Sequence, residues 1–186
     1  GDVIALSRRG LELVARQPPG PRRDERELSF LVPMAVALHA GATQNSDDLW
    51  VYERVTDLRA QLGLPPDPST VRTMANRAIL RRDFPQAQRH GEQLLAQAEE
   101  TGDPLLLTEG HYLLGVSTFW QGALELSRLH LRQALTIYSP GRAAQHLALF
   151  GQDPKAVCLI RLAWTTWHLG RFDEAEALVE EALTYA

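Results

Sequence analysis

The sequence predicts an all-α protein built from antiparallel helix pairs, and three observations support this. Apolar residues recur at spacings of three and four, as in segments 157–164 and 175–183, which is the period of an amphipathic helix. No run alternates polar and apolar residues between hairpin turns, so strands are not expected. Asp-Pro pairs stand at 67–68, 103–104 and 153–154. In each pair the Asp caps a first helical turn, and the Pro occupies a position that needs no N–H.

The helices follow one another in the order set by the breaks between them. The individual helices are predicted at 2–16, 23–42, 46–63, 68–82, 84–101, 104–121, 123–138, 154–169 and 171–186. Breaks at 82–84, 121–124 and 169–172 are too short to join anything except antiparallel neighbours. The nine helices therefore form a leading helix 2–16 and four hairpins, which together make one repeat domain. The hairpins are 23–63, 68–101, 104–138 and 154–186.

Two segments interrupt this regular order. Pro33 lies inside the second predicted helix, where its ring removes a backbone hydrogen bond, so it indicates a kink or a later helix start. Residues 139–152 form a longer connection, in which we expect a short helix over 146–150.

Composition excludes several classes of protein. With 186 residues, of which 45% are hydrophobic, the chain has enough apolar surface for a core. Its net charge of −4 gives no basic footprint for nucleic acid. No apolar run is long enough to cross a membrane and no signal peptide opens the chain. The single cysteine, Cys158, permits no internal disulfide, lies on an apolar helical face as a buried, inert thiol, and indicates a cytoplasmic location.

The last three hairpins share a pattern of small and large residues around their turns. Small residues that let helices approach closely are Gly115, Ala163 and Ala175, with Ala134 and Ala182 further on. Large residues expected to fill the gap between hairpins are Phe84, Leu124 and Phe172. This pattern resembles the tetratricopeptide repeat, a helix-turn-helix unit of about 34 residues. Equivalent small positions at 87, 127 and 175 stand 40 and 48 residues apart, which is longer than that period, and hairpin 23–63 matches the pattern poorly.

A narrower resemblance lies in the run 150–159, the following Leu162-Ala163-Trp164 and the earlier segment 119–122. These stretches resemble large bacterial signal-transduction ATPases that carry a carboxy-terminal array of such repeats. The output domain of that family is a nucleotide cyclase, a protein kinase or a helix-turn-helix DNA-binding domain. The resemblance implies a sensor or scaffold role in signalling or transcription regulation. It places no active site here, and the sequence has no phosphate loop of the Walker type. Because the chain begins with Gly1, we expect it to be a fragment of a longer protein.

The tetratricopeptide resemblance also implies a groove lined by the first helix of each pair. The groove positions carried over are Arg72, Asn76, Glu109, Tyr112, Phe119, Trp164, Trp167 and His168. Aromatic residues in a groove supply large contact area for a partner, although each could instead pack against neighbouring helices. Tyr112 and Trp164 are the stronger groove candidates, whereas Trp120 is expected to close its helix end.

Metal-binding and catalytic patterns are not found. None of the six histidines forms a His-Glu-x-x-His or two-Cys, two-His pattern. His146 and Asp153 flank the long connection and could meet at a metal, but two ligands without a third do not make a site. Asp153 is expected to be a helix cap, and no cofactor is expected.

The leading hypothesis is therefore a non-catalytic module that binds a protein or peptide, including other domains of its parent protein. A second hypothesis is a small-molecule sensor in which Tyr112, Phe119, Trp164 and Trp167 form a closed pocket. A third is self-association into a homo-oligomer through an exposed apolar end of the array. An enzyme is the weakest hypothesis, because no base, nucleophile or metal set is visible.

Overall fold

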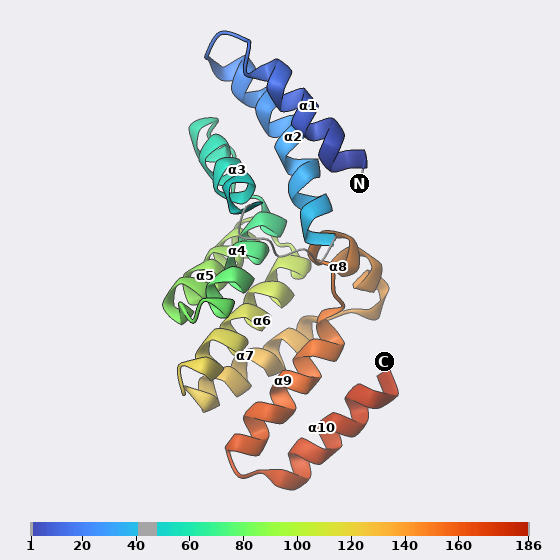
Figure 1. The fold of residues 1–186 in the computed structure, drawn as a ribbon. Helices are drawn as coiled ribbons and strands as arrows, with labels where there is room; N and C mark the ends of the chain where they lie inside the picture. Colours follow the sequence, from blue (N-terminus) through green and yellow to red (C-terminus); the bar gives the residue numbers. More distant parts are fainter. Residues whose placement is uncertain (1, 41–47, 186) are drawn as a thin grey trace. The chain divides into compact units, whose positions relative to one another are not determined.

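The computed structural model describes residues 2–40 and 48–185, and this part of the chain is all-helical, with no strand (Figure 1). The predicted fold class is thereby confirmed. The helices are α1 (Asp2–Val14), α2 (Pro21–Ala40), α3 (Leu49–Gln61), α4 (Pro68–Leu80), α5 (Phe84–Thr101), α6 (Pro104–Trp120), α7 (Leu124–Ile137), the 3₁₀ helix η2 (Pro140–Arg142), α8 (Ala143–Phe150), α9 (Pro154–His168) and α10 (Phe172–Tyr185).

The helix bounds follow the sequence pattern closely, with two differences of substance. Helix α2 runs through Pro33, so this residue does not mark a helix start. The connection after α7 holds η2 and an eight-residue helix, α8, which begins three residues before the predicted position 146. The predicted helix end at 42 and helix start at 46 lie outside the described residues.

The three Asp-Pro pairs act as helix starts, as predicted. The Asp103 carboxylate accepts a hydrogen bond from the Leu105 amide at 2.9 Å, and Asp153 accepts one from the Lys155 amide at 2.9 Å. Asp67 accepts from the Thr70 amide at 2.8 Å. Each carboxylate satisfies an amide that has no partner within its own helix, which is the reason that Asp favours this position.

The chain divides into two compact units, Gly1–Thr73 and Met74–Ala186, which we describe separately. In the first unit α1 packs on α2, and α2 packs on α3. Gly10 permits the first of these contacts, since a Cβ at this position would lie 2.4 Å from the Phe30 ring. The Arg54 guanidinium donates two hydrogen bonds, of 2.6 and 2.8 Å, to the Glu27 carboxylate and so joins α3 to α2. The leading helix thus packs on the helix that follows it.

In the second unit the helices pack in succession, α5 on α6, α6 on α7, α7 on α9 and α9 on α10, and α9 also contacts α6. This order places each new hairpin against the previous one, as Figure 1 shows for the yellow, orange and red segments. The side chains that fill the spaces between these helices include Leu94, Leu113, Leu131, Leu159 and Leu162, all of which are buried.

The turns inside the hairpins of the second unit are copies of one another. Arg82, Gly122 and Gly170 take left-handed conformations, with φ of 61°, 81° and 77°. The Gly122 amide donates to the carbonyl of Phe119, and the Gly170 amide donates to that of Trp167. The same bonds therefore recur at a shift of 48 residues, from 122 to 170. The repeat predicted from side-chain pattern is present in the backbone.

Helix α8 folds back onto the beginning of α6. Phe150, which is buried, packs against Ala98 of α5 and Leu106 of α6. The His146 Nδ1 atom lies 3.1 Å from the Glu109 Oε1 atom, and both side chains are fully buried. The extra residues between α7 and α9, which lengthen this repeat, thus form a short helix that covers part of α6.

Candidate interaction surface

The eight residues predicted to line a groove do not share one surface. Arg72, Glu109 and Tyr112 are buried, with exposed fractions of 1%, 0% and 6%, so they are not available to a partner on this fold. The cause for Glu109 is α8, whose His146 covers it. Asn76 and Phe119 are half-buried. The structure leaves exposed only the candidates in the last hairpin, which are Trp164, Trp167 and His168.

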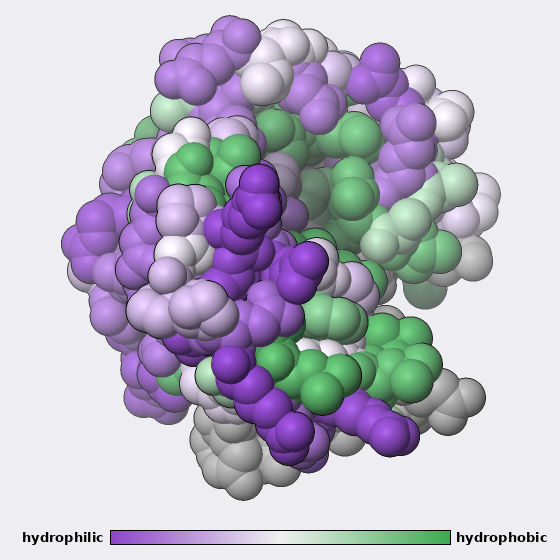
Figure 2. Space-filling model, turned by 90° about the horizontal axis from the view of Figure 1, so that it is seen from above, coloured by the Kyte–Doolittle hydropathy of each residue, from purple (hydrophilic) through white to green (hydrophobic). Residues whose placement is uncertain are grey.

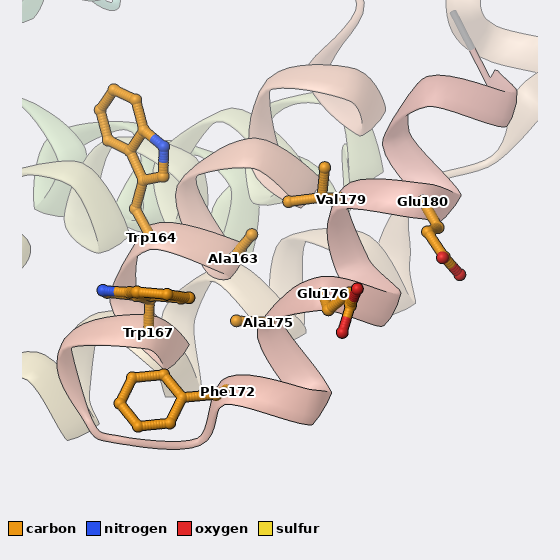
Figure 3. Close-up of a pocket in the computed structure, with 8 residues that line it drawn as sticks. All are labelled: Ala163, Trp164, Trp167, Phe172, Ala175, Glu176, Val179 and Glu180. Atoms are coloured by element: carbon orange, nitrogen blue, oxygen red, sulfur yellow. The ribbon is translucent and has the colours of Figure 1, made fainter.

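The exposed candidates belong to a hollow of about 480 Å³ between α9 and α10, shown in Figure 3. We call its lining the α9–α10 surface. Its residues are Ala163, Trp164, Trp167, Phe172, Ala175, Glu176, Val179 and Glu180. Both helices contribute residues to this lining. On each helix these residues are largely three or four positions apart, so they lie on one face of it.

Three aromatic side chains dominate the α9–α10 surface. Trp164, Trp167 and Phe172 have exposed fractions of 48%, 59% and 53%. The Trp167 and Phe172 rings meet edge to face at 4.7 Å. The sequence predicts that Phe172 fills a gap between hairpins; no hairpin after α10 is described, and the Phe172 ring leans on Trp167 and is 53% exposed. Ala163 and Ala175 are buried, line the same hollow and form its apolar floor.

Charges border this apolar surface on its two helices. The guanidinium of Arg161, from α9, lies 4.8 Å from the centre of the Trp164 ring in a cation–π contact. Glu176 and Glu180 line the α10 side. The Nδ1 atom of His168 is engaged within the chain, because it hydrogen-bonds to the Trp164 carbonyl at 2.7 Å. The surface therefore combines exposed aromatic rings with an acidic edge.

The hairpin that carries this surface is held to α7 by polar contacts. The Ser127 and Thr165 hydroxyls lie 3.2 Å apart in the buried interface between α7 and α9. Glu174 of α10 forms ion pairs with Arg128, at 3.4 Å, and with Arg132. Burial raises the pKa of the Glu174 carboxyl, but the hydrogen bond from Arg132 and the two positive charges outweigh this effect and lower it overall. Glu174 thus remains charged near neutral pH.

Asp153 ties the two ends of the hairpin to α7. Its Oδ2 atom accepts hydrogen bonds from the Tyr185 hydroxyl at 2.7 Å and the Tyr138 hydroxyl at 3.1 Å. Burial, together with hydrogen bonds to Tyr185 and Asp153, raises the pKa of the Tyr138 phenol, so this group stays a neutral donor. His146 instead pairs with Glu109, so Asp153 and His146 do not meet in one site. Among the described residues, no group of three His, Cys, Asp or Glu side chains is placed to hold a metal.

The four aromatic residues of the proposed closed pocket are not brought together either. Only Trp164 and Trp167 line the hollow, while Tyr112 is buried and Phe119 contacts His168 edge to face at 5.3 Å. Trp120, expected to close its helix end, stacks on Phe84 at 6.1 Å and remains 48% exposed. The sequence pattern did not point to Glu176, Val179 and Glu180, which a shift of 48 residues would have aligned with Arg128, Leu131 and Arg132.

Elsewhere the surface is mixed. Figure 2 shows hydrophobic patches between strongly hydrophilic areas on the face seen from above. None of the described helices is long and apolar enough to cross a membrane.

Comparison with known proteins identifies the last hairpin. Residues 156–185 match a family model described as a tetratricopeptide repeat, and this segment spans nearly all of α9 and α10. No curated protein matches the chain. Tetratricopeptide repeats generally mediate protein–protein interactions and are typically non-catalytic scaffolds. The match, the copied turns and the successive packing of hairpins together support an array of tetratricopeptide-like repeats.

Proposed function

We propose that this chain is a non-catalytic protein-interaction module that binds an α-helical segment of a partner at the α9–α10 surface. The observation that carries the proposal is the exposure of Trp164, Trp167 and Phe172 around a floor of buried alanines. Large aromatic residues of this kind dominate the binding energy of protein interfaces. They also bury much apolar area with little loss of side-chain freedom.

The wider setting is part of the same proposal. The resemblance of segment 150–159 to bacterial signal-transduction ATPases favours a cytoplasmic signalling or transcription-regulatory protein, with other domains of the parent protein as partners. The net charge of −4 makes nucleic acid an unfavourable partner for this chain.

A helix suits this surface better than a small molecule does. Binding sites for small molecules enclose most of the surface of their ligand. Here Trp164 and Trp167 are about half exposed on an open face, so a small ligand would retain much of its own contact with water. A helix laid between α9 and α10 would instead cover both rings and the floor between them.

Replacement of single tryptophans tests the proposal. Binding of the chain to the other domains of its parent protein, and to a panel of amphipathic helical peptides, is measured by calorimetry. We expect Trp164→Ala and Trp167→Ala each to weaken binding by about tenfold or more. The matched control is Trp50→Ala, which removes a tryptophan of similar exposure, 45%, from α3. Binding that is insensitive to both α9 replacements would refute the proposed surface.

A further inference from the structure

Within the second unit α9 covers the α6–α7 hairpin, and this docked arrangement shows what the α9–α10 surface would receive. Helix α9 packs against both α6 and α7. Beneath it, Gly115 brings α6 close to α7, because a Cβ there would lie 2.5 Å from the Leu131 side chain. The incoming hairpin is fixed at its edge by ion pairs from Arg171 and Glu174, which flank the start of its second helix.

The α9–α10 pair has the same construction, displaced by 48 residues. The turn bonds coincide, since Ala123 N–H donates to Thr118 O and Arg171 N–H donates to Thr166 O. On this alignment Val116 corresponds to Trp164, and Leu131 corresponds to Val179. We call the face of α6 and α7 that α9 covers the α6–α7 surface; Ser127, whose hydroxyl lies 3.2 Å from that of Thr165 in α9, belongs to it.

Exposure distinguishes the occupied surface from the unoccupied one. Val116 and Leu131 have exposed fractions of 2% and 0%, whereas Trp164 and Val179 have fractions of 48% and 45%. The floor residues Ala163 and Ala175 are already buried by their own hairpin. The equivalent positions are therefore buried in the α6–α7 hairpin, on which α9 docks, and exposed in the α9–α10 hairpin.

The two surfaces carry opposite charges at one pair of edge positions. Arg128 and Arg132 of α7 bind Glu174 of the incoming hairpin. Their counterparts on α10 are Glu176 and Glu180. In a partner hairpin that docks in the same way, a carboxylate at the position equivalent to Glu174 would be repelled, and a positive charge there would be attracted.

A second contact at the edge points the same way. Glu125 of α7 binds Arg171 of the incoming hairpin at 3.0 Å. Its counterpart on α10, Asp173, is also acidic. The complementary partner therefore carries basic residues at two positions, the last residue of its turn and the third residue of its second helix.

The hairpins of the second unit do not themselves meet this requirement. The two positions hold Asp83 and Gln86 in the first hairpin, Ala123 and Leu126 in the second, and Arg171 and Glu174 in the third. None is basic at both. A second copy of the chain, docking through one of these hairpins, would therefore be a poor match for the acidic edge.

From this comparison we propose that the α9–α10 surface docks a helical hairpin of a partner protein, with Lys or Arg at the end of the turn and three residues later. The inference rests on the proposed function and adds the chemistry of the partner. Aromatic contact with Trp164 and Trp167 supplies binding energy, and the acidic edge formed by Asp173, Glu176 and Glu180 supplies selectivity.

A charge exchange tests the proposal with two proteins and two peptides. The proteins are the full chain and its Glu176→Arg/Glu180→Arg variant. The peptides span residues 154–185, either unchanged or with Glu174→Arg. We expect the full chain to bind the Glu174→Arg peptide about tenfold more tightly than the unchanged one at low salt. The variant should reverse this preference, and added salt should weaken both preferences.

Selection from a displayed library of the same hairpin, with positions 171 and 174 randomised, tests all charge combinations at these positions rather than two. The full chain should enrich Lys and Arg at both positions, and the variant should enrich Asp and Glu at 174. Equal binding of the two peptides, or no charge enrichment, would overturn the proposed partner chemistry. The role of the surface itself would then still be decided by the tryptophan replacements. Self-association of the full chain that Trp164→Ala abolishes would assign the surface to a second copy and likewise overturn this proposal.

Discussion

The close approach of α6 and α7 at Gly115 yields a quantitative prediction about core packing. A Cβ added at Gly115 would lie 2.5 Å from Cγ and 2.7 Å from Cδ2 of Leu131, well inside van der Waals contact. Overpacking of this kind costs about 1–3 kcal/mol. The better helix propensity of Ala returns about 1 kcal/mol. The Gly115→Ala replacement should therefore lower the free energy of unfolding by about 0–2 kcal/mol.

The last hairpin shows how the clash is relieved. At the equivalent positions it has Ala163 and Val179, so a larger residue on the first helix faces a smaller one on the second. Leu131→Val alone should cost about 1 kcal/mol, since it removes one methylene from a fully buried site. In the double variant the added and removed volumes offset each other, so the two effects should couple favourably by about 1 kcal/mol.

The assay is urea unfolding of the four proteins of this double-mutant cycle, followed by tryptophan fluorescence. Three of the four tryptophans, Trp120, Trp164 and Trp167, lie in the unit that contains the mutated pair. Strictly additive effects would refute the packing argument, because they would mean that the methyl group introduced by Gly115→Ala and the Leu131 side chain do not compete for space.

Three further outcomes follow from the structure. Arg82→Gly should raise the free energy of unfolding by about 1 kcal/mol, measured by denaturation, because Arg82 holds φ at 61° where the equivalent Gly122 has no steric penalty; a loss of stability would contradict this. Phe150→Ala should cost about 3–5 kcal/mol and increase amide exchange in α8, because Phe150 is 2% exposed against α5 and α6; unchanged exchange would contradict it. His111 and His130 lie with their Nδ1 atoms 3.1 Å apart, and burial lowers the pKa of each, with the charge of His130 lowering that of His111 further. Because the folded state resists protonation, the pair's contribution to stability is full above the ordinary pKa of 6.5 and falls as pH drops through it. His130→Gln should therefore make the urea midpoint of unfolding change less with pH between about pH 7.5 and 5.5. An equally steep dependence of the midpoint on pH would count against the pair.

The elements that the sequence predicts well are those with local causes. Asp67, Asp103 and Asp153 start helices because the capping bond lies within three residues of the Asp. The turns at Gly122 and Gly170 are equally local, since a left-handed residue ends one helix and the next begins two residues later. The bounds of the helices could therefore be derived from the sequence alone to within a few residues.

The groove residues could not be derived in this way, because their exposure depends on segments distant in sequence. Glu109 occupies a groove position of its helix, but the chain returns 37 residues later and places His146 on it. Nothing in the sequence around Glu109 reports this contact. Phe172 differs from Glu109, because its size predicts a filler between hairpins, whereas its ring lies against Trp167 and is 53% exposed.

These two departures have one structural consequence for the proposed function. Glu109, a residue transferred from the tetratricopeptide pattern, is inaccessible because α8 covers α6 there. In the last hairpin Trp164 and Trp167 are 48% and 59% exposed, and with His168 they are the transferred residues that a partner can reach. The acidic residues Glu176 and Glu180 lie beside them, where α7 has arginines. The part of the chain that matches a tetratricopeptide repeat model is thus also the part whose surface charges differ from those of the neighbouring repeat, and we propose that this difference selects its partner.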